Sequence, residues 1–140
     1  LGREPLHRQP IAGLFTDAFC LVAEVIESKV KPAQPWGSVA QAAFTDQPLR
    51  TGTGVVHQAL AAAGRQDVDP AGITPMNGIT ILGASSDHLV VAEGSGSMAV
   101  GDELRFDVNY SALVRAMTSP FVSRTFIGTG DRTPAVALAR

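Results

Sequence analysis

Short apolar runs, rich in β-branched residues, make up most of this chain and are separated at close intervals by glycine and proline. The 140 residues include 14 glycines and 9 prolines, so few stretches are long enough to form an uninterrupted helix. Runs of this length and composition are typical of β-strands joined by turns. The sequence therefore predicts a mainly β domain, a small barrel or sandwich, with one short helix.

The first and longest run, 19–30, alternates only in part, and we expect a strand that is buried on most of both faces. Prolines 32 and 35 end it, because proline donates no hydrogen bond to a sheet. In segment 55–63 the alanines favour a helix, whereas the neighbouring strands and Gly64 favour a strand, which we prefer. Segments 39–44 and 51–54 flank a loop. Further strands are predicted at 79–82, 89–92, 104–108 and 121–127, with a turn at 69–72 and a glycine-serine hairpin at 93–97.

The one predicted helix covers 110–117, with Asn109 as its N-cap and Leu113, Ala116 and Met117 on one side. Thr118-Ser119-Pro120 follows and stops it. The domain organisation expected from these signals is an extended N-terminal arm at 1–14, a β-domain at 15–127 and a loose C-terminal tail at 128–140.

Charge and hydropathy argue against two classes of partner. The formal net charge is −2 and no basic cluster is longer than 29–31, whereas nucleic-acid binding needs a concentrated basic surface. No segment reaches the ~20 apolar residues of a membrane-spanning helix. The single cysteine, Cys20, lies in an apolar run and is expected to be a buried, reduced thiol of a cytoplasmic protein.

Part of the surface is expected to be covered by another domain or subunit. The charged fraction is 17%, below the usual value of about a quarter. The chain also lacks an initiator methionine, which is compatible with its excision from a longer polypeptide.

Common ligand-binding motifs are incomplete in this sequence. The segment 67–72 begins like a calcium loop but lacks the later carboxylates, and the Gly-X-Gly pairs lack the third glycine of a phosphate-binding loop. One cysteine and three scattered histidines do not give the spacing of a zinc site. No metal site is therefore expected.

Two polar clusters, 64–67 and 83–88, interrupt apolar surroundings. Polar groups packed between buried strands need partners or a ligand, because an unpaired buried group costs on the order of 1–3 kcal/mol. His88 beside Asp87 is the strongest candidate, since histidine is the residue type best suited to proton transfer near neutral pH. A structural alternative stays open: Ser85 and Asp87 would cap backbone amides, and Arg65 would pair with Asp67 to brace a turn.

Several motifs occur in order between residues 15 and 124. They are Phe15-Thr16-Asp17-Ala18-Phe19, Val22-Ala23-Glu24-Val25-Ile26-Glu27, Gly64-Arg65-Gln66-Asp67-Val68, Gly83-Ala84-Ser85-Ser86-Asp87-His88, Asn109-Tyr110 and Met117-Thr118-Ser119-Pro120-Phe121. Together they resemble the C-terminal β-domain of ornithine-racemase-like members of the alanine racemase superfamily.

The resemblance implies an enzyme that uses pyridoxal 5′-phosphate (PLP), with an N-terminal (β/α) barrel followed by this β-domain. It implies that the Schiff-base lysine and the phosphate site belong to the barrel. The β-domain would close the active site of the partner subunit in a head-to-tail homodimer and would be inactive alone. The substrate would be an amino acid whose α-proton is removed and returned.

Racemisation needs a proton donor and a proton acceptor on opposite faces of the α-carbon, and one of them would be the lysine of the barrel. Alanine racemases use a tyrosine early in this domain as the second, but the one tyrosine here, Tyr110, lies too late in the sequence. We therefore expect His88, oriented by Asp87, to act as the second base. Residues expected to face the substrate or cofactor are Arg65, Gln66, Asp67, Ser85 and Ser86.

Two rival functions remain. The first is a free-standing β-barrel module that binds a small ligand or a protein partner without catalysis. The second is a metal-dependent, lyase-like site at Asp87 and His88, because a related branch of the same cofactor superfamily places a metal near such a position. The lack of a second strong ligand nearby argues against the metal site.

Overall fold

The computed structural model describes residues 1–34, 36–37, 53–76, 78–93, 98–126 and 136–139. Within these ranges the strands are β1 (Cys20–Pro32), β2 (Val55–Ala61), β3 (Ile73–Pro75), β4 (Ile79–Ala84), β5 (Leu89–Glu93), β6 (Glu103–Val108), β7 (Val122–Arg124) and β8 (Val136–Ala139). The helical elements are the 3₁₀ turn η1 (Pro70–Gly72) and the α-helix α1 (Tyr110–Thr118).

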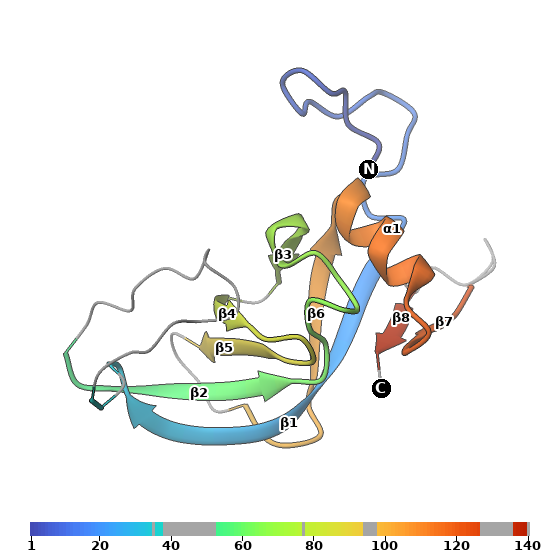
Figure 1. Ribbon diagram of the computed structural model, residues 1–140. Coiled ribbons are helices and arrows are strands. Elements are labelled where there is room, and N and C mark those ends of the chain that lie inside the picture. Colours follow the sequence, from blue (N-terminus) through green and yellow to red (C-terminus); the bar gives the residue numbers. More distant parts are fainter. Residues whose placement is uncertain (35, 38–52, 77, 94–97, 127–135, 140) are drawn as a thin grey trace.

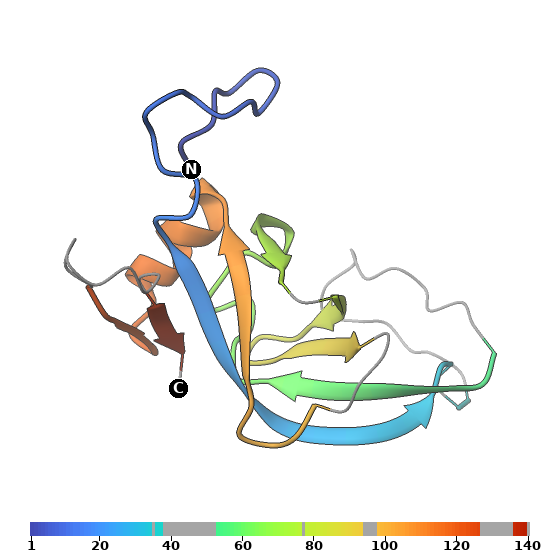
Figure 2. The same cartoon turned by 180° about the vertical axis from the view of Figure 1, so that it is seen from behind.

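The strands form one strongly curved sheet in the order β3-β6-β1-β2-β5-β4. The first part of β1 pairs with β6 and the rest pairs with β2, both antiparallel. The outer strands β3 and β4 lie next to each other, so the sheet is nearly closed into a barrel, with α1 and the N-terminal arm at one end (Figures 1 and 2). The predicted mainly β fold with one short α-helix is confirmed.

The core fills the inside of the curved sheet. Residues 20–23 of β1 are buried on both faces, as the sequence predicted, but from Glu24 onwards only Val25 is buried. Cys20 is buried as expected, and this burial raises the pKa of its thiol. The largest fully buried side chains are Phe106, Leu21, Leu89, Val22, Val25, Val68 and Val91.

Helix α1 begins where the sequence predicted. The side-chain oxygen of Asn109 accepts a hydrogen bond from the backbone N–H of Ala112 at 2.9 Å, which is the expected N-cap. The buried face differs in part from the prediction, because Ala112 and Ala116 are buried while Met117 is 37% exposed. Small alanine side chains let the helix approach the sheet closely, and the longer Met117 is left at the rim.

The sequence predicted an extended arm, but in the structure the arm folds back on itself. The carboxylate of Glu4 accepts hydrogen bonds from the backbone N–H groups of Leu6, His7 and Gln9, at 2.6 to 3.0 Å, and the arm therefore folds back on itself. In Figure 1 it projects away from the sheet above α1. These three bonds lower the pKa of Glu4, the bond from Gln9 most of all.

Segment 55–63 is confirmed as a strand as far as Ala61, and the predicted turn at 69–72 is the 3₁₀ turn η1. The final predicted strand, 121–127, is shorter and forms β7 only. Within the predicted loose tail, β8 pairs with β1 and β7, and its alternation of small and branched residues suits a strand. Segment 39–44, the loop at 46–48 and the hairpin residues 94–97 lie outside the described residues. No helix in the described part of the chain is long and apolar enough to cross a membrane.

The Asn109 cap gives a test of the fold. Changing Asn109 to Ala removes the acceptor for the Ala112 amide and should destabilise the domain by about 1 kcal/mol. Urea unfolding followed by circular dichroism measures this change. Ser123→Ala, at an exposed position of β7, is the control and should change stability by less than about 0.5 kcal/mol. Equal stability of the two variants would contradict the capping role.

Candidate functional site

The structure brings the two polar clusters of the sequence together. One forms the turn 64–68 after β2, and the other forms the loop 85–88 that joins β4 to β5. Strands β2 and β5 are paired, with Ala61 opposite Leu89, so the turn and the loop lie side by side. We call them the 64–68 turn and the 85–88 loop.

Backbone contacts fix the turn against the loop. The N–H of Arg65 donates to the carbonyl of Ser85 and the N–H of Gln66 donates to the carbonyl of Ser86, both at 2.9 Å. Gly64 lies directly beneath them, and a Cβ atom there would be 2.3 Å from the Ser86 carbonyl oxygen. Only glycine permits so close an approach, which gives Gly64 a steric role in the site.

Asp67 braces the turn from inside the domain. It is 4% exposed, and its two carboxylate oxygens accept hydrogen bonds from the N–H of Gly64 and the hydroxyl of Ser119, both at 3.0 Å. Ser119 follows α1, so Asp67 links the 64–68 turn to the end of the helix. A buried carboxylate with two donors in this arrangement holds other elements in place.

A second carboxylate ties the same region to the start of the helix. Asp69 caps η1 through the N–H of Ala71, and the hydroxyl of Ser111 donates to its other oxygen at 2.6 Å. The bond from Ser111 is the main cause of the lowered pKa of Asp69, and Arg115 and Arg65 add to it electrostatically. The Arg115 guanidinium also donates to the Arg65 carbonyl at 2.7 Å.

The exposed carboxylate of Asp87 is engaged by two neighbours. The side-chain amide of Gln66 donates to one oxygen and the hydroxyl of Ser86 donates to the other, each at 2.6 Å. Among the described residues, the imidazole of His88 forms no hydrogen bond, with Asp87 or with any other group. Its backbone is held by Ser85, whose hydroxyl accepts from the His88 N–H at 3.0 Å. Bonding from Asp87 therefore does not orient the His88 ring here.

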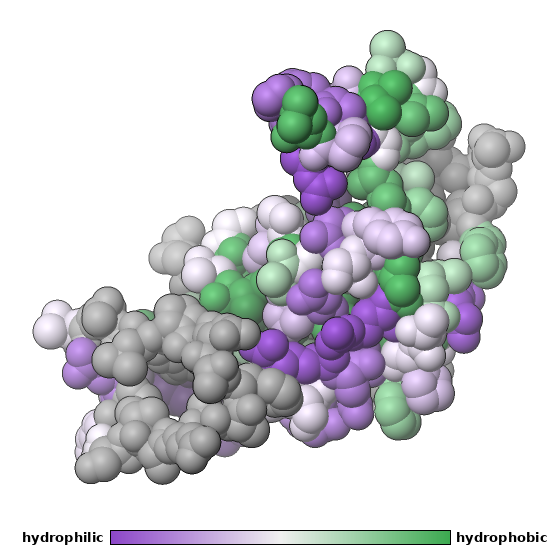
Figure 3. All heavy atoms as spheres, turned by 45° about the horizontal axis from the view of Figure 1, so that its top comes forward, coloured by the Kyte–Doolittle hydropathy of each residue, from purple (hydrophilic) through white to green (hydrophobic). Residues whose placement is uncertain are grey.

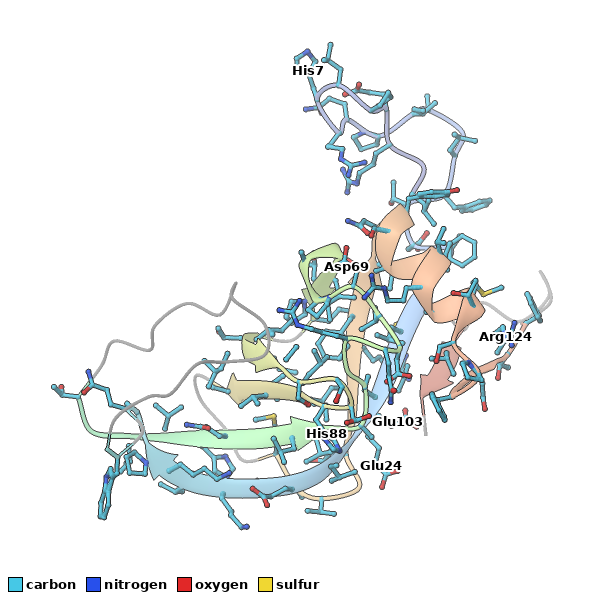
Figure 4. All side chains as sticks on the ribbon, in the orientation of Figure 1. His7, Glu24, Asp69, His88, Glu103 and Arg124 are labelled. Carbon is cyan, nitrogen blue, oxygen red and sulfur yellow. The ribbon has the colours of Figure 1, made fainter. Side chains whose placement is uncertain are left out.

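Two glutamates that the sequence did not single out lie at the same edge as His88 (Figure 4). Glu24 and Glu103 are opposite each other on β1 and β6, and the carbonyl of Glu24 accepts from the N–H of Ala62. Because Ala61 pairs with both Val25 and Leu89, the preceding residues, Glu24 and His88, fall in one row on the outer face. Each glutamate is a charged residue next to buried strand residues, which could have marked it as a candidate. The strand pairing that brings the two together with His88 cannot be predicted from the local sequence.

Two cavities lie elsewhere in the domain. One, of about 230 Å³, is mainly apolar and lies between the start of β1, α1 and the residues after β7. The other, of about 510 Å³, lies between the arm and the β3, β6 and α1 elements, and Arg3, Arg8 and Tyr110 line it. Neither is lined by Asp87 or His88. Over the residues that the structure describes, no group of three or more His, Cys, Asp or Glu side chains could hold a metal ion.

Hydrophobic residues are exposed in several places on the surface. Figure 3 shows them on the arm, next to hydrophilic ones, while hydrophilic residues extend across the middle of the same face. The large hydrophobic residues exposed on the arm and around α1 and β7 include Leu6, Leu14, Phe15, Phe19, Met117, Phe121 and Phe126. An apolar region of this kind on a small domain usually marks a contact with another protein surface.

The sequence is similar to part of two amino-acid racemases. Ornithine racemase of Acetoanaerobium sticklandii is 35% identical over 130 residues, which are 91% of this chain and 37% of that protein. Lysine racemase of Thermotoga maritima is 39% identical over 128 residues, which are 90% of this chain and 36% of that protein. The chain thus spans little more than a third of the length of the curated relatives it matches. No family model and no solved structure matches the sequence significantly.

Both lysines of the chain are engaged with one carboxylate. Lys29 and Lys31 form ion pairs with Glu27 at 2.9 and 2.7 Å, and these bonds lower the pKa of Glu27 to about 2. At pH values above the ordinary pKa of glutamate, the lowered pKa of Glu27 stabilises the folded state. This contribution is lost as the pH falls through about 2. The groups are at the surface, so the pairs stabilise the domain only slightly.

Asp67→Ala should destabilise the domain by about 2–3 kcal/mol, because it leaves the Gly64 N–H and the Ser119 hydroxyl buried without an acceptor. Chemical unfolding measures the loss. Asp17→Ala, at an exposed position between the arm and β1, serves as the control and should stay within about 0.5 kcal/mol of the parent. A similar small effect for Asp67→Ala would show that the brace is not needed.

Lys31→Gln should raise the pKa of Glu27 from about 2 towards its ordinary value, since one of its two ion pairs is lost. An NMR titration of the Glu27 carboxyl carbon measures the shift directly. Arg105→Gln, which removes a cation outside this cluster, should leave the titration unchanged. A Glu27 pKa that stays near 2 in Lys31→Gln would mean that Lys31 does not contribute.

Proposed function

We propose that this chain is the C-terminal β-domain of a PLP-dependent amino-acid racemase and that it closes the active site of a partner subunit. The observation that carries the proposal is the 35–39% identity to an ornithine racemase and a lysine racemase over about 90% of the chain. Because the match covers little more than a third of those proteins, the rest of such an enzyme would lie outside these 140 residues. The proposed remainder is an N-terminal (β/α) barrel, in a cytoplasmic homodimer.

The chain's own residues do not fit the role of holding the cofactor. A Schiff base requires an available amine, usually of low pKa, whereas Lys29 and Lys31 are charged partners of Glu27 at the surface of β1. The proposal therefore assigns PLP and its lysine to the (β/α) barrel. The cofactor supplies an electron sink for the α-carbon when it is bound there.

Within this domain, His88 is the residue proposed to accept and return a proton. Its ring is half-buried at the outer edge of the sheet, and no described residue binds either ring nitrogen. The 85–88 loop is fixed by the 64–68 turn, so the ring is carried by an ordered backbone. Glu24 and Glu103 at the same edge add negative charge, part of which Arg105 offsets through its ion pair with Glu103 at 3.9 Å, and the remaining charge would attract a cationic substrate side chain such as that of ornithine or lysine.

Large hydrophobic side chains are exposed near the arm and beside α1. They support the proposal that another domain or subunit packs against this surface. Phe15 is 78% exposed and Phe126 is 84% exposed, which is unusual for a small protein in water. Covering these residues would remove their apolar surface from water and stabilise the assembly.

A second candidate function is a module that binds a small ligand without catalysis. The cavity of about 510 Å³ between the arm and the sheet has the volume of an ordinary ligand pocket. Its lining includes two arginines, Arg3 and Arg8, and one carboxylate, Asp107, so the excess positive charge would suit an anionic ligand.

His88→Ala in the natural polypeptide should reduce kcat for racemisation by about 10²–10⁴, the usual contribution of a general acid or base. Racemisation of L-ornithine, L-lysine and L-alanine is measured by optical rotation or by chiral chromatography of the two enantiomers. Visible absorbance reports the amount of bound PLP. His7→Ala is the matched control, because His7 lies at the tip of the arm, far from His88 in Figure 4.

Two results would contradict parts of this proposal. An unchanged kcat in His88→Ala would remove His88 as the base. Absence of PLP and of racemisation in the natural polypeptide would remove the racemase function and favour the ligand-binding module.

A further inference from the structure

Gln66 occupies the contact between the 64–68 turn and the 85–88 loop. Its backbone N–H donates to the Ser86 carbonyl at 2.9 Å, and its side-chain amide donates to the Asp87 carboxylate at 2.6 Å. Both bonds end on the two residues that directly precede His88. Gln66 is itself exposed, so its side chain is not needed to fill the core.

We propose that Gln66 is a positioning residue, which holds the 85–88 loop and through it sets the position of His88, rather than a group that contacts the substrate. The inference rests on the proposed function for its catalytic part. Its structural part, the ordering of the loop by Gln66, stands on the contacts alone.

The way in which Asp87 is bonded supports this role. Its carboxylate oxygens accept from Gln66 and Ser86, one bond each, so Asp87 anchors the loop tip, and in this structure it forms no bond with the His88 ring. The amide of Gln66 is a neutral donor, and it satisfies an exposed carboxylate without placing a cation next to the imidazole. A bond to a charged acceptor is stronger than a neutral one, which suits a contact that must order a surface loop.

Other contacts hold mainly the base of the loop; those that reach its tip are the Gln66 N–H bond to the Ser86 carbonyl and the Asp87 N–H bond to the Ser85 hydroxyl at 3.3 Å. The Arg65 N–H reaches Ser85, and the Ser85 hydroxyl accepts from the N–H of His88. Apart from the Ser86 hydroxyl, which belongs to the same loop, Gln66 is the one described residue whose side chain bonds the Asp87 carboxylate. Loss of this amide would therefore loosen the tip while leaving the strands β2, β4 and β5 paired.

The test compares Gln66→Ala, Gln66→Glu and Gln66→Lys in the natural polypeptide, with Gln34→Ala as a control at an exposed glutamine of the region after β1. Hydrogen exchange of the Arg65 and Gln66 amides reports whether the turn still holds the loop. We expect exchange to accelerate on the order of tenfold in Gln66→Ala and more in Gln66→Glu, where two carboxylates repel. Gln66→Lys should restore slow exchange, because its ammonium can bind Asp87.

Kinetics separate positioning from substrate contact. Gln66→Ala should lower kcat on the order of tenfold with KM nearly unchanged, and Gln66→Lys should recover part of kcat with a shifted pH profile, since a cation now lies near His88. A higher KM with unchanged kcat and unchanged amide exchange would show that Gln66 contacts the substrate, and would overturn the inference.

Failure of the proposed function would look different. If amide exchange accelerates in Gln66→Ala and slows again in Gln66→Lys, the ordering of the loop is supported, even where the natural polypeptide racemises no amino acid. In that case the racemase proposal fails and the structural part of the inference remains. Unchanged exchange in all three variants would overturn the inference whatever the enzyme activity.

Discussion

The long strand β1 is the element on which the rest of the domain depends, because its two parts pair with different strands. Residues 20–24 pair with β6, and residues 25–32 pair with β2 after an irregularity between Val25 and Glu27. The Val25 N–H and carbonyl bond to Asp102 and Gly101, which keeps the backbone satisfied where the partner changes. The change of partner curves the sheet into a barrel, and it brings the end of β2 and the start of β6 to the same edge. The candidate site lies at this edge.

Local signals were sufficient to predict most of the strands and the helix, because each depends on nearby residues. Alternation and β-branched composition located β1, β4, β5 and β6, and Asn109 located the helix start. The expected extended arm instead folds back through local contacts, because three backbone amides, two to five residues after Glu4, converge on its carboxylate. Composition cannot report that convergence, and it cannot report that residues 136–139 would add a parallel strand to β1.

The candidate site was predicted as residue types but not as an arrangement. The sequence selected Asp67 and Asp87 alike, yet the first is buried and braces the helix end, while the second is exposed and anchors a loop. Both carboxylates follow apolar strands, so hydropathy gives them the same pattern. Only the fold decides which of them finds internal donors, because that depends on Ser119, more than fifty residues away from Asp67. The orientation of His88 by Asp87 stays a prediction, because in this structure the carboxylate accepts from Gln66 and Ser86 and forms no bond with the His88 ring.

Proton transfer at a carbon atom requires a site from which water is largely excluded, and the edge that carries His88 is open on this chain. Many of the exposed hydrophobic residues lie elsewhere, on the arm and around α1 and β7, while others, such as Val30 and Val55, lie on β1 and β2. A racemase built on this domain must therefore cover two separate surfaces. One domain packed against the arm would leave the His88 edge in water, and one packed against that edge would leave Phe15 and Phe126 exposed. The proposed head-to-tail homodimer would meet both demands, because the proposed (β/α) barrel of the same polypeptide would cover the arm while that of the partner would face the 85–88 loop. Each of the two surfaces would then have its own cover in the proposed enzyme.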